Sequence, residues 1–150
     1  YLNAEALMAA QTLRSIGMNV DAQTSDWATI GGRRAKKDAP DAGGWNMYVT
    51  VAGSFDADSP ITNAYLSAAC GTALPGWPCN KELDDLRIAW LKEGNPAKRK
   101  ELLDKFHAQA YEALPYINAG QYSPAVAVRK EIKGADPLFN GLPLMWFLDK

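Results

Sequence analysis

Asp56 and Asp58 are the residues of this sequence whose types and spacing best suit chemistry, and they lie in the segment WNMYVTVAGSFDADSP, which runs from Trp45 to Pro60. Two nearby carboxylates can divide the roles of general acid and general base when their surroundings separate their pKa values. One carboxylate can instead accept charge-assisted hydrogen bonds from a ligand's ammonium group. Without a neighbouring histidine, lysine or set of metal ligands, recognition is favoured over hydrolysis. A turn that the aspartates shape before Pro60 is the alternative without a ligand.

Aromatic side chains form a second group of candidates for ligand contact, and several of them lie near expected turns. Their large apolar faces suit the recognition of varied ligands at a small entropic cost. Most tryptophans in a domain of this size fill the core, so for each single residue a core position is favoured over ligand contact. The group consists of Trp27, Trp45, Tyr48, Phe55, Trp77 and Tyr122.

His107 is the only histidine, so a Ser-His-Asp or Cys-His arrangement would need it. It follows Phe106 in an expected helix, and the sequence contains no GxSxG nucleophile elbow. The glycine pairs at 31–32 and 43–44 lack the context of a phosphate-binding loop. Two cysteines and one distant histidine leave a zinc ion short of ligands. No metal or other cofactor is therefore expected.

Cys70 and Cys79 lie nine positions apart in CGTALPGWPC, a segment whose glycines and prolines can turn the chain back on itself. A disulfide that closes this loop would stabilise the fold by roughly 2–3 kcal/mol in the chain-entropy estimate, and it would imply an oxidising compartment. Two free, partly buried thiols in a cytosolic protein are the alternative. The residues alone favour the disulfide only slightly.

Length and composition bound the possible functions. The chain has 150 residues, 47% of them hydrophobic, which suffices for one core of ordinary size. The formal charge is −1 and the lysines and arginines are scattered, so no nucleic-acid partner is expected. No apolar run approaches the roughly 20 residues that span a bilayer. Because Tyr1 is not preceded by a methionine and a helix follows almost at once, we expect a piece of a longer chain.

Helices and strands are expected to alternate in the elements that position these residues, which predicts an α/β fold. In such a sheet, ligands dock beyond the carboxyl ends of strands, where Asp56 is expected. The apolar cluster 142–148, with Trp146 and Phe147, is expected to pack on this core or on a partner lobe. Helices are expected over 3–17, 26–37, 60–69, 80–94 and 95–113. Strands or extended segments are expected over 18–23, from 45 to the acidic turn that carries Asp56 and Asp58, over 115–121 and over 125–132.

Five segments together resemble, in the family's order, the C-terminal part of family 5 extracellular solute-binding proteins, the dipeptide- and oligopeptide-binding receptors of ABC importers. The segments are LMAAQTLRSIGMNVDAQTSDWATIGGRRAKK, GGWNMYVTVAGSFDADSP, WPCNKELDDLRIAW, PAKRKELLDKFHAQAYEALPYINAGQY and RKEIKG. Each motif is weak alone, but their shared order is specific. The resemblance covers nearly the whole chain.

This resemblance implies a type II periplasmic binding protein, whose two lobes close on a ligand around a hinge. Residues 1–150 would form a single domain, the C-terminal ligand-binding lobe, with a mixed sheet flanked by helices. In peptide-binding members the aspartate of a W-x-x-D-x-x-x-P motif holds the α-ammonium of the peptide, and Asp56 has that position, with Gly53 in place of the tryptophan. We expect Asp56, together with the aromatic candidates Phe55, Trp27, Trp45 and Tyr48, to bind the ligand.

The resemblance also implies solute capture without catalysis. The implied partners are a peptide or other small amine-bearing ligand, the membrane permease of the ABC transporter, and the N-terminal lobe of the same receptor. Dipeptide-binding members carry a disulfide in the region of Cys70 and Cys79, which strengthens the expectation of that bridge and of a periplasmic location, or of an extracellular, membrane-anchored lipoprotein. The alternatives are a hydrolase-type enzyme that uses Asp56 and Asp58, and a non-catalytic structural or interaction module.

Overall fold

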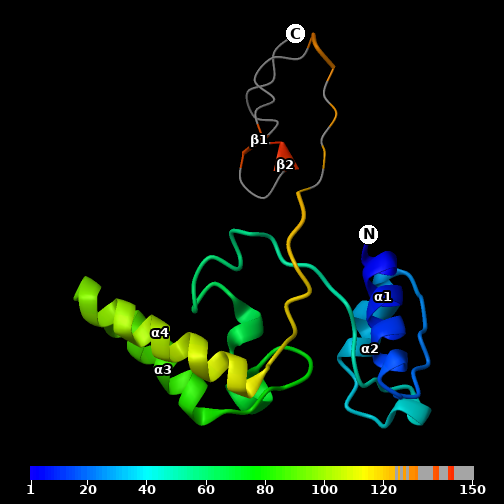
Figure 1. The fold of residues 1–150 in the computed structure, drawn as a ribbon, viewed down its shortest axis with the longest axis horizontal. Helices are drawn as coiled ribbons and strands as arrows, with labels where there is room; N and C mark the ends of the chain where they lie inside the picture. The colour runs from blue at the N-terminus through cyan, green and yellow to red at the C-terminus, as the bar shows by residue number, and fades with distance from the viewer. Residues whose placement is uncertain (124, 126, 128, 132–136, 139–141, 144–150) are drawn as a thin grey trace. The chain divides into compact units, whose positions relative to one another are not determined.

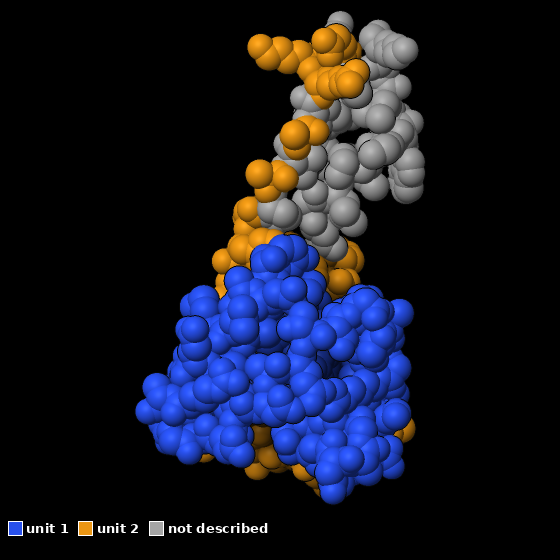
Figure 2. Space-filling model, turned by 90° about the vertical axis from the view of Figure 1, so that its right-hand side faces the viewer, with its two compact units in different colours: residues 1–51, 74–77 blue, residues 52–73, 78–150 orange. Residues whose placement is uncertain are grey.

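The computed structural model describes residues 1–150 except 124, 126, 128, 132–136, 139–141 and 144–150. The chain divides into two compact units, which Figure 2 distinguishes by colour. Unit 1 comprises Tyr1–Val51 and Leu74–Trp77, and unit 2 comprises Ala52–Ala73 and Pro78–Lys150. The expected single domain over residues 1–150 stays a prediction.

Helix α1 (Leu2–Ser15) opens unit 1 and confirms the first predicted helix. Ala10 is buried on it, whereas Met8 is 68% exposed. The helix ends in a Schellman motif, because the Met18 N–H donates to the Leu13 carbonyl and the Gly17 N–H to the Arg14 carbonyl. Gly17 has a φ of +90°, a conformation that glycine adopts without steric cost.

Helix α2 (Trp27–Arg34) is shorter than the predicted 26–37. Asp26 caps it, since its carboxylate accepts hydrogen bonds from the backbone N–H and the hydroxyl of Thr29, at 3.0 and 2.6 Å. The 3₁₀ helix η1 (Pro40–Ala42) follows α2. Gly44 is required there, because a Cβ atom at this position would lie 1.8 Å from the carbonyl oxygen of Asp38.

Helices α3 (Lys81–Lys92) and α4 (Pro96–Ala113) form the helical hairpin of unit 2, and they pack along each other (Figure 1). Asn80 caps α3 by accepting from the Leu83 N–H, and Asn95 caps α4 by accepting from the Ala97 N–H. Leu83 and Phe106 are fully buried and pack with Ala68. This small cluster is the hydrophobic core of unit 2.

The predicted helix over 60–69 is wrong in extent, because only the 3₁₀ helix η2 (Ala64–Leu66) forms there, followed by η3 (Cys70–Thr72). Side chains compete with the helix for backbone groups in this segment. The Ser59 hydroxyl accepts from the Thr62 N–H, the Thr62 hydroxyl oxygen accepts from the Ser59 N–H, and the Asn63 side chain accepts from the Tyr65 N–H. These local bonds favour turns over an α-helix.

The predicted mixed sheet flanked by helices, and with it the α/β class, is wrong for the described residues, which are mainly helical. Strands occur among them only as β1 (Pro137–Leu138) and β2 (Leu142–Pro143), paired antiparallel. The segments 18–23, 45–51 and 115–121 contain no strand, nor do the described residues of 125–132. Residues 144–148 of the expected apolar cluster, with Trp146 and Phe147, lie outside the described residues.

Alternation of polar and apolar residues favours an extended backbone, but a strand also needs a neighbour that accepts and donates its ladder hydrogen bonds. In the segment 18–23 a side chain supplies one such partner instead. The Arg14 guanidinium donates to the Val20 carbonyl over 2.7 Å. The period of the sequence therefore does not provide the pairing that makes a sheet.

Candidate functional site

The acidic turn is the first part of the candidate site, and it lies in unit 2. The backbone N–H groups of Asp56 and Ala57 donate to the Gly53 carbonyl, over 3.0 and 3.2 Å. Asp56 and Asp58 are exposed, and Phe55 is 58% exposed. The turn thus presents two carboxylates and an aromatic ring to solvent. Such exposure suits contact with a ligand, whereas a catalytic pair of carboxylates needs a buried, polarised setting.

The chain that follows the acidic turn is bound to helix α3. Pro60 is buried, and its carbonyl oxygen accepts a hydrogen bond from the Arg87 Nε over 2.8 Å. The Arg87 Nη2 donates to the Ile61 carbonyl over 3.2 Å. The sequence does not single out Arg87, because nothing in the pattern of α3 distinguishes a guanidinium that bonds a distant loop from one that points to solvent.

Three aromatic rings meet in unit 1. The rings of Trp45 and Tyr48 lie edge to face with their centroids 4.9 Å apart, and the rings of Trp45 and Trp77 are 6.3 Å apart. The Trp45 indole N–H donates to the Arg34 carbonyl, and the Lys37 ammonium lies 4.5 Å from the centroid of the Trp77 ring. The hydrogen bond and the ring contacts fix the Trp45 side chain. The three rings resemble a small aromatic core with a cation on one side.

Trp27 and Phe55 are the other predicted aromatic contacts of a ligand. Trp27 is 51% exposed, with the Arg34 guanidinium 5.5 Å from its ring centroid. Trp27, Trp45 and Tyr48 belong to unit 1, whereas Phe55 and Asp56 belong to unit 2. The structure brings Trp45 and Tyr48 together, and a ligand site that uses all five residues stays a prediction.

The predicted disulfide between Cys70 and Cys79 is confirmed. Backbone hydrogen bonds also join the two segments that the disulfide links. The Cys70 N–H donates to the Pro78 carbonyl, and the Asn80 N–H donates to the Ala68 carbonyl. The bridge closes a loop that includes the segment 74–77, which belongs to unit 1. Within the loop, the Trp77 N–H donates to the Leu74 carbonyl.

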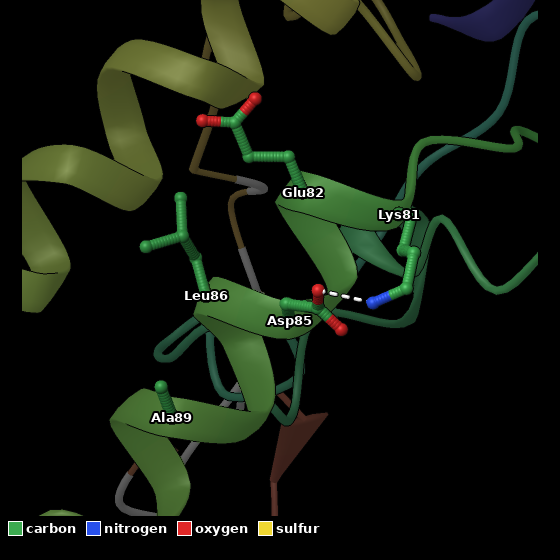
Figure 3. Close-up of a pocket in the computed structure, with 5 residues that line it drawn as sticks. All are labelled: Lys81, Glu82, Asp85, Leu86 and Ala89. Carbon is green, nitrogen blue, oxygen red and sulfur yellow. Dashed lines mark hydrogen bonds and ion pairs between the residues drawn. The ribbon is translucent and has the colours of Figure 1, made fainter.

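A shallow depression of about 490 Å³ lies along one face of helix α3 (Figure 3). Lys81 and Asp85, one turn apart, form an ion pair at its rim. All of its lining residues come from the same helix, and none of them is a predicted site residue. They are Lys81, Glu82, Asp85, Leu86 and Ala89. A depression with walls from a single helix encloses too little of a small molecule to form a binding cleft.

Catalytic and metal-binding alternatives gain no support from the described geometry. His107 is exposed on α4, with its ring 6.1 Å from that of Phe106. In the part of the chain that the structure describes, no three His, Cys, Asp or Glu residues are placed to hold a metal ion.

Among the described residues, no helix combines the length and the apolar character needed to cross a membrane.

Comparison with known proteins gives one informative match. No protein-family model matches the chain. Over 148 residues, or 99% of its length, the chain is 33% identical to the probable peptide ABC transporter periplasmic-binding protein y4tO of Sinorhizobium fredii (strain NBRC 101917 / NGR234). The match covers 27% of that protein, so the chain spans about a quarter of the length of this relative. The resemblance to the solute-binding proteins of ABC importers, which the sequence motifs predicted, is confirmed by this match.

Proposed function

We propose that this chain takes part in the capture of a small solute for an ABC importer, and that it acts by binding without catalysis. The similarity over 99% of the chain to a protein named as a peptide ABC transporter periplasmic-binding protein supports this proposal. The partners are then the solute, the N-terminal lobe of the same receptor and the membrane permease of the importer.

Asp56 is the proposed anchor of the ligand. Its carboxylate, on an exposed turn, accepts charge-assisted hydrogen bonds from an ammonium group of the bound solute. A hydrogen bond to a charged group contributes roughly 1.5–3 kcal/mol once water is excluded, and much less while the turn faces solvent. The affinity therefore depends on the surface that covers Asp56 when the ligand is bound.

The aromatic residues supply the apolar contacts in this proposal. Phe55 is adjacent to the anchor and exposes its ring, and Trp27 offers a half-exposed indole. Trp45 and Tyr48 are partly buried and in contact with each other, so they offer a ligand the edges of a fixed cluster. Rigid aromatic surfaces of this kind bind side chains of varied shape at a small entropic cost.

The Cys70–Cys79 disulfide supports a location in the periplasm or outside the cell. Disulfides persist in oxidising compartments, whereas the cytosol keeps most thiols reduced. A periplasmic location also agrees with the name of the relative. The receptor would then meet its solute before the membrane permease does.

Isothermal titration calorimetry of the full-length receptor with a dipeptide tests the anchoring role of Asp56. The probe is Ala-Ala, compared with N-acetyl-Ala-Ala, which lacks the ammonium group. Asp56→Ala should weaken binding of the free dipeptide by roughly tenfold or more, since it removes a charged hydrogen-bond partner. Asp58→Ala is the matched control and should leave the affinity nearly unchanged. Equal affinities of wild type and Asp56→Ala for the free dipeptide would refute the anchor.

The solute class can be identified without a guess about its structure. The protein is purified from a periplasmic extract under native conditions, and the compounds that it releases on denaturation are identified by mass spectrometry. A set of short peptides would support peptide capture with Asp56 as the ammonium anchor. A single compound without an amino group would contradict the anchor while it supports solute capture, and the absence of any released compound would favour a structural or interaction module.

A further inference from the structure

Arg87 joins helix α3 to the chain that carries the acidic turn. Its guanidinium donates to two successive carbonyl oxygens, that of Pro60 from Nε over 2.8 Å and that of Ile61 from Nη2 over 3.2 Å. Its side chain is only 17% exposed. A planar guanidinium fits such a pair of acceptors because its N–H groups form a rigid fork, which an ammonium group lacks.

Asp84, one turn before Arg87 on the same helix, balances this charge. Its Oδ1 lies 3.7 Å from the Arg87 Nη1 and is buried without a hydrogen-bond partner. A buried carboxylate oxygen is costly unless an opposite charge lies near it. The pair therefore holds the Arg87 side chain on the face of α3 that meets the chain after the turn.

The segment that Arg87 bonds also has hydrogen bonds of its own. Ser59 and Thr62 exchange side-chain and backbone hydrogen bonds, and the Asn63 N–H donates to the Ser59 carbonyl over 3.0 Å. Pro60 is buried and has a fixed φ. Asp56 lies four residues before Pro60, so the base from which the acidic turn projects is the segment that Arg87 binds.

We propose that Arg87 is a positioning residue for Asp56: it fixes the base of the acidic turn through the Pro60 and Ile61 carbonyls, and Asp84 keeps its guanidinium in place. The role in ligand binding rests on the proposed function of Asp56. The mechanical role of Arg87, which is to order the acidic turn, does not rest on that function, because it concerns the protein without ligand. A binding group is effective only when the residues around it hold its geometry.

The test compares substitutions of two arginines that lie in unit 2, made in the whole protein. Arg87→Met removes the fork and keeps an apolar stem, whereas Arg99→Met removes a guanidinium of α4 that lies 3.8 Å from the centroid of the Trp90 ring. The first measurement is ¹⁵N relaxation of the Asp56 and Ala57 amides, which reports picosecond to nanosecond order. Arg87→Met should lower the order parameters of both amides, and Arg99→Met should not. Unchanged order in Arg87→Met would overturn the proposal.

The second measurement is a double-mutant cycle on the affinity for Ala-Ala. Arg87→Met should weaken binding roughly tenfold in the wild-type background and have no further effect in the Asp56→Ala background, since it acts through Asp56. Equal losses in both backgrounds would overturn the positioning role. If Asp56→Ala alone leaves the affinity unchanged, the anchor is refuted, and the order parameters still decide the mechanical role. Should Arg87→Met fail to fold, Arg87→Lys replaces it, with the same direction of change expected.

Discussion

The side-chain amide of Asn63 donates a hydrogen bond to the hydroxyl of Tyr116, 53 positions further along the chain, over 3.2 Å. Asn63 is 5% exposed, and its Oδ1 accepts from the Tyr65 N–H over 3.1 Å. One buried amide therefore binds the chain after helix α4 with one end and caps η2 with the other. Because buried polar groups are costly when unpaired, this amide makes the packing of the two segments specific.

Removal of the Tyr116 hydroxyl should lower the free energy of unfolding by about 1 kcal/mol, because the buried amide of Asn63 loses its partner. Asn63→Ala should cost more, since the Tyr65 N–H also loses its acceptor. Urea denaturation of Tyr116→Phe and Asn63→Ala measures both losses. Tyr111→Phe is the control, because Tyr111 is 79% exposed on α4. Equal stabilities of the Tyr116 and Tyr111 variants would show that the hydrogen bond contributes nothing.

The Cys70–Cys79 bridge gives a second prediction. The Cys70→Ala/Cys79→Ala variant should unfold with a free energy roughly 2–3 kcal/mol below that of the oxidised wild type, because the open loop gains conformational entropy in the unfolded state. Urea denaturation with and without a reductant measures the difference. The reductant should destabilise the wild type by a similar amount and leave the double variant unchanged. A wild type that is insensitive to the reductant, with its thiols shown to be free, would contradict this prediction.

The aromatic cluster of unit 1 gives a third prediction. With their centroids 6.3 Å apart, the indoles of Trp45 and Trp77 should couple and produce an exciton couplet in the far-UV circular dichroism spectrum. Trp77→Phe and Trp45→Phe should each abolish the couplet. Trp90→Phe should preserve it, because the Trp90 ring contacts Arg99 in unit 2. A couplet that survives in Trp77→Phe would contradict the observed contact.

Local signals in the sequence predicted much of the helical structure. The helix ends expected at positions 17, 80 and 95 are confirmed: Gly17 has a positive φ, and Asn80 and Asn95 cap the helices that follow them. Each of these signals acts within a few residues, through a side chain that satisfies a nearby backbone group or through a permitted φ. Helix boundaries of this kind can be predicted from sequence because the interactions that set them are local.

The sheet and the site could not be predicted in the same manner. Alternation in segment 18–23 determines which side chains share a face, but strand formation depends on a partner that sequence period does not specify. The same limit applies to Arg87, because its guanidinium bonds carbonyls 26 and 27 positions away in the sequence. The Cys70–Cys79 bridge could be predicted because the two cysteines are close in sequence, no other cysteine competes, and the family resemblance strengthened the expectation.

The core of unit 2 gives a fourth prediction, which compares two leucines on one helix. Leu83 is fully buried against Phe106, whereas Leu91 is 52% exposed. Leu83→Ala should lower the free energy of unfolding by about 2–5 kcal/mol, through lost burial and the cavity left behind. Leu91→Ala should change it by less than about 0.5 kcal/mol. Urea denaturation followed by helical circular dichroism measures both, and similar losses in the two variants would contradict the assignment of the core.

Asp26 gives the last prediction, which concerns pH. The hydroxyl of Thr29, and then its backbone N–H, donate to the Asp26 carboxylate and hold the pKa of this carboxyl below its ordinary value of 3.8. Because the folded state has the lower pKa, the stabilisation from this cap is fully present above the ordinary pKa and is lost as the pH falls through the folded pKa. The cap of α2 should therefore fail only in strongly acidic solution.

The pKa of Asp26 can be measured by NMR titration of its side-chain carboxyl carbon. Thr29→Val removes the hydroxyl that contributes most to the shift, so the pKa of Asp26 should move back toward 3.8. Thr12→Val is the matched control, because the Thr12 hydroxyl donates to the Met8 carbonyl on α1 and should leave the Asp26 titration unchanged. Asp26→Asn keeps an acceptor for the Thr29 N–H but does not ionise, so it should remove this part of the pH dependence of stability. An Asp26 carboxyl that titrates identically in wild type and Thr29→Val would show that the hydroxyl does not stabilise the carboxylate.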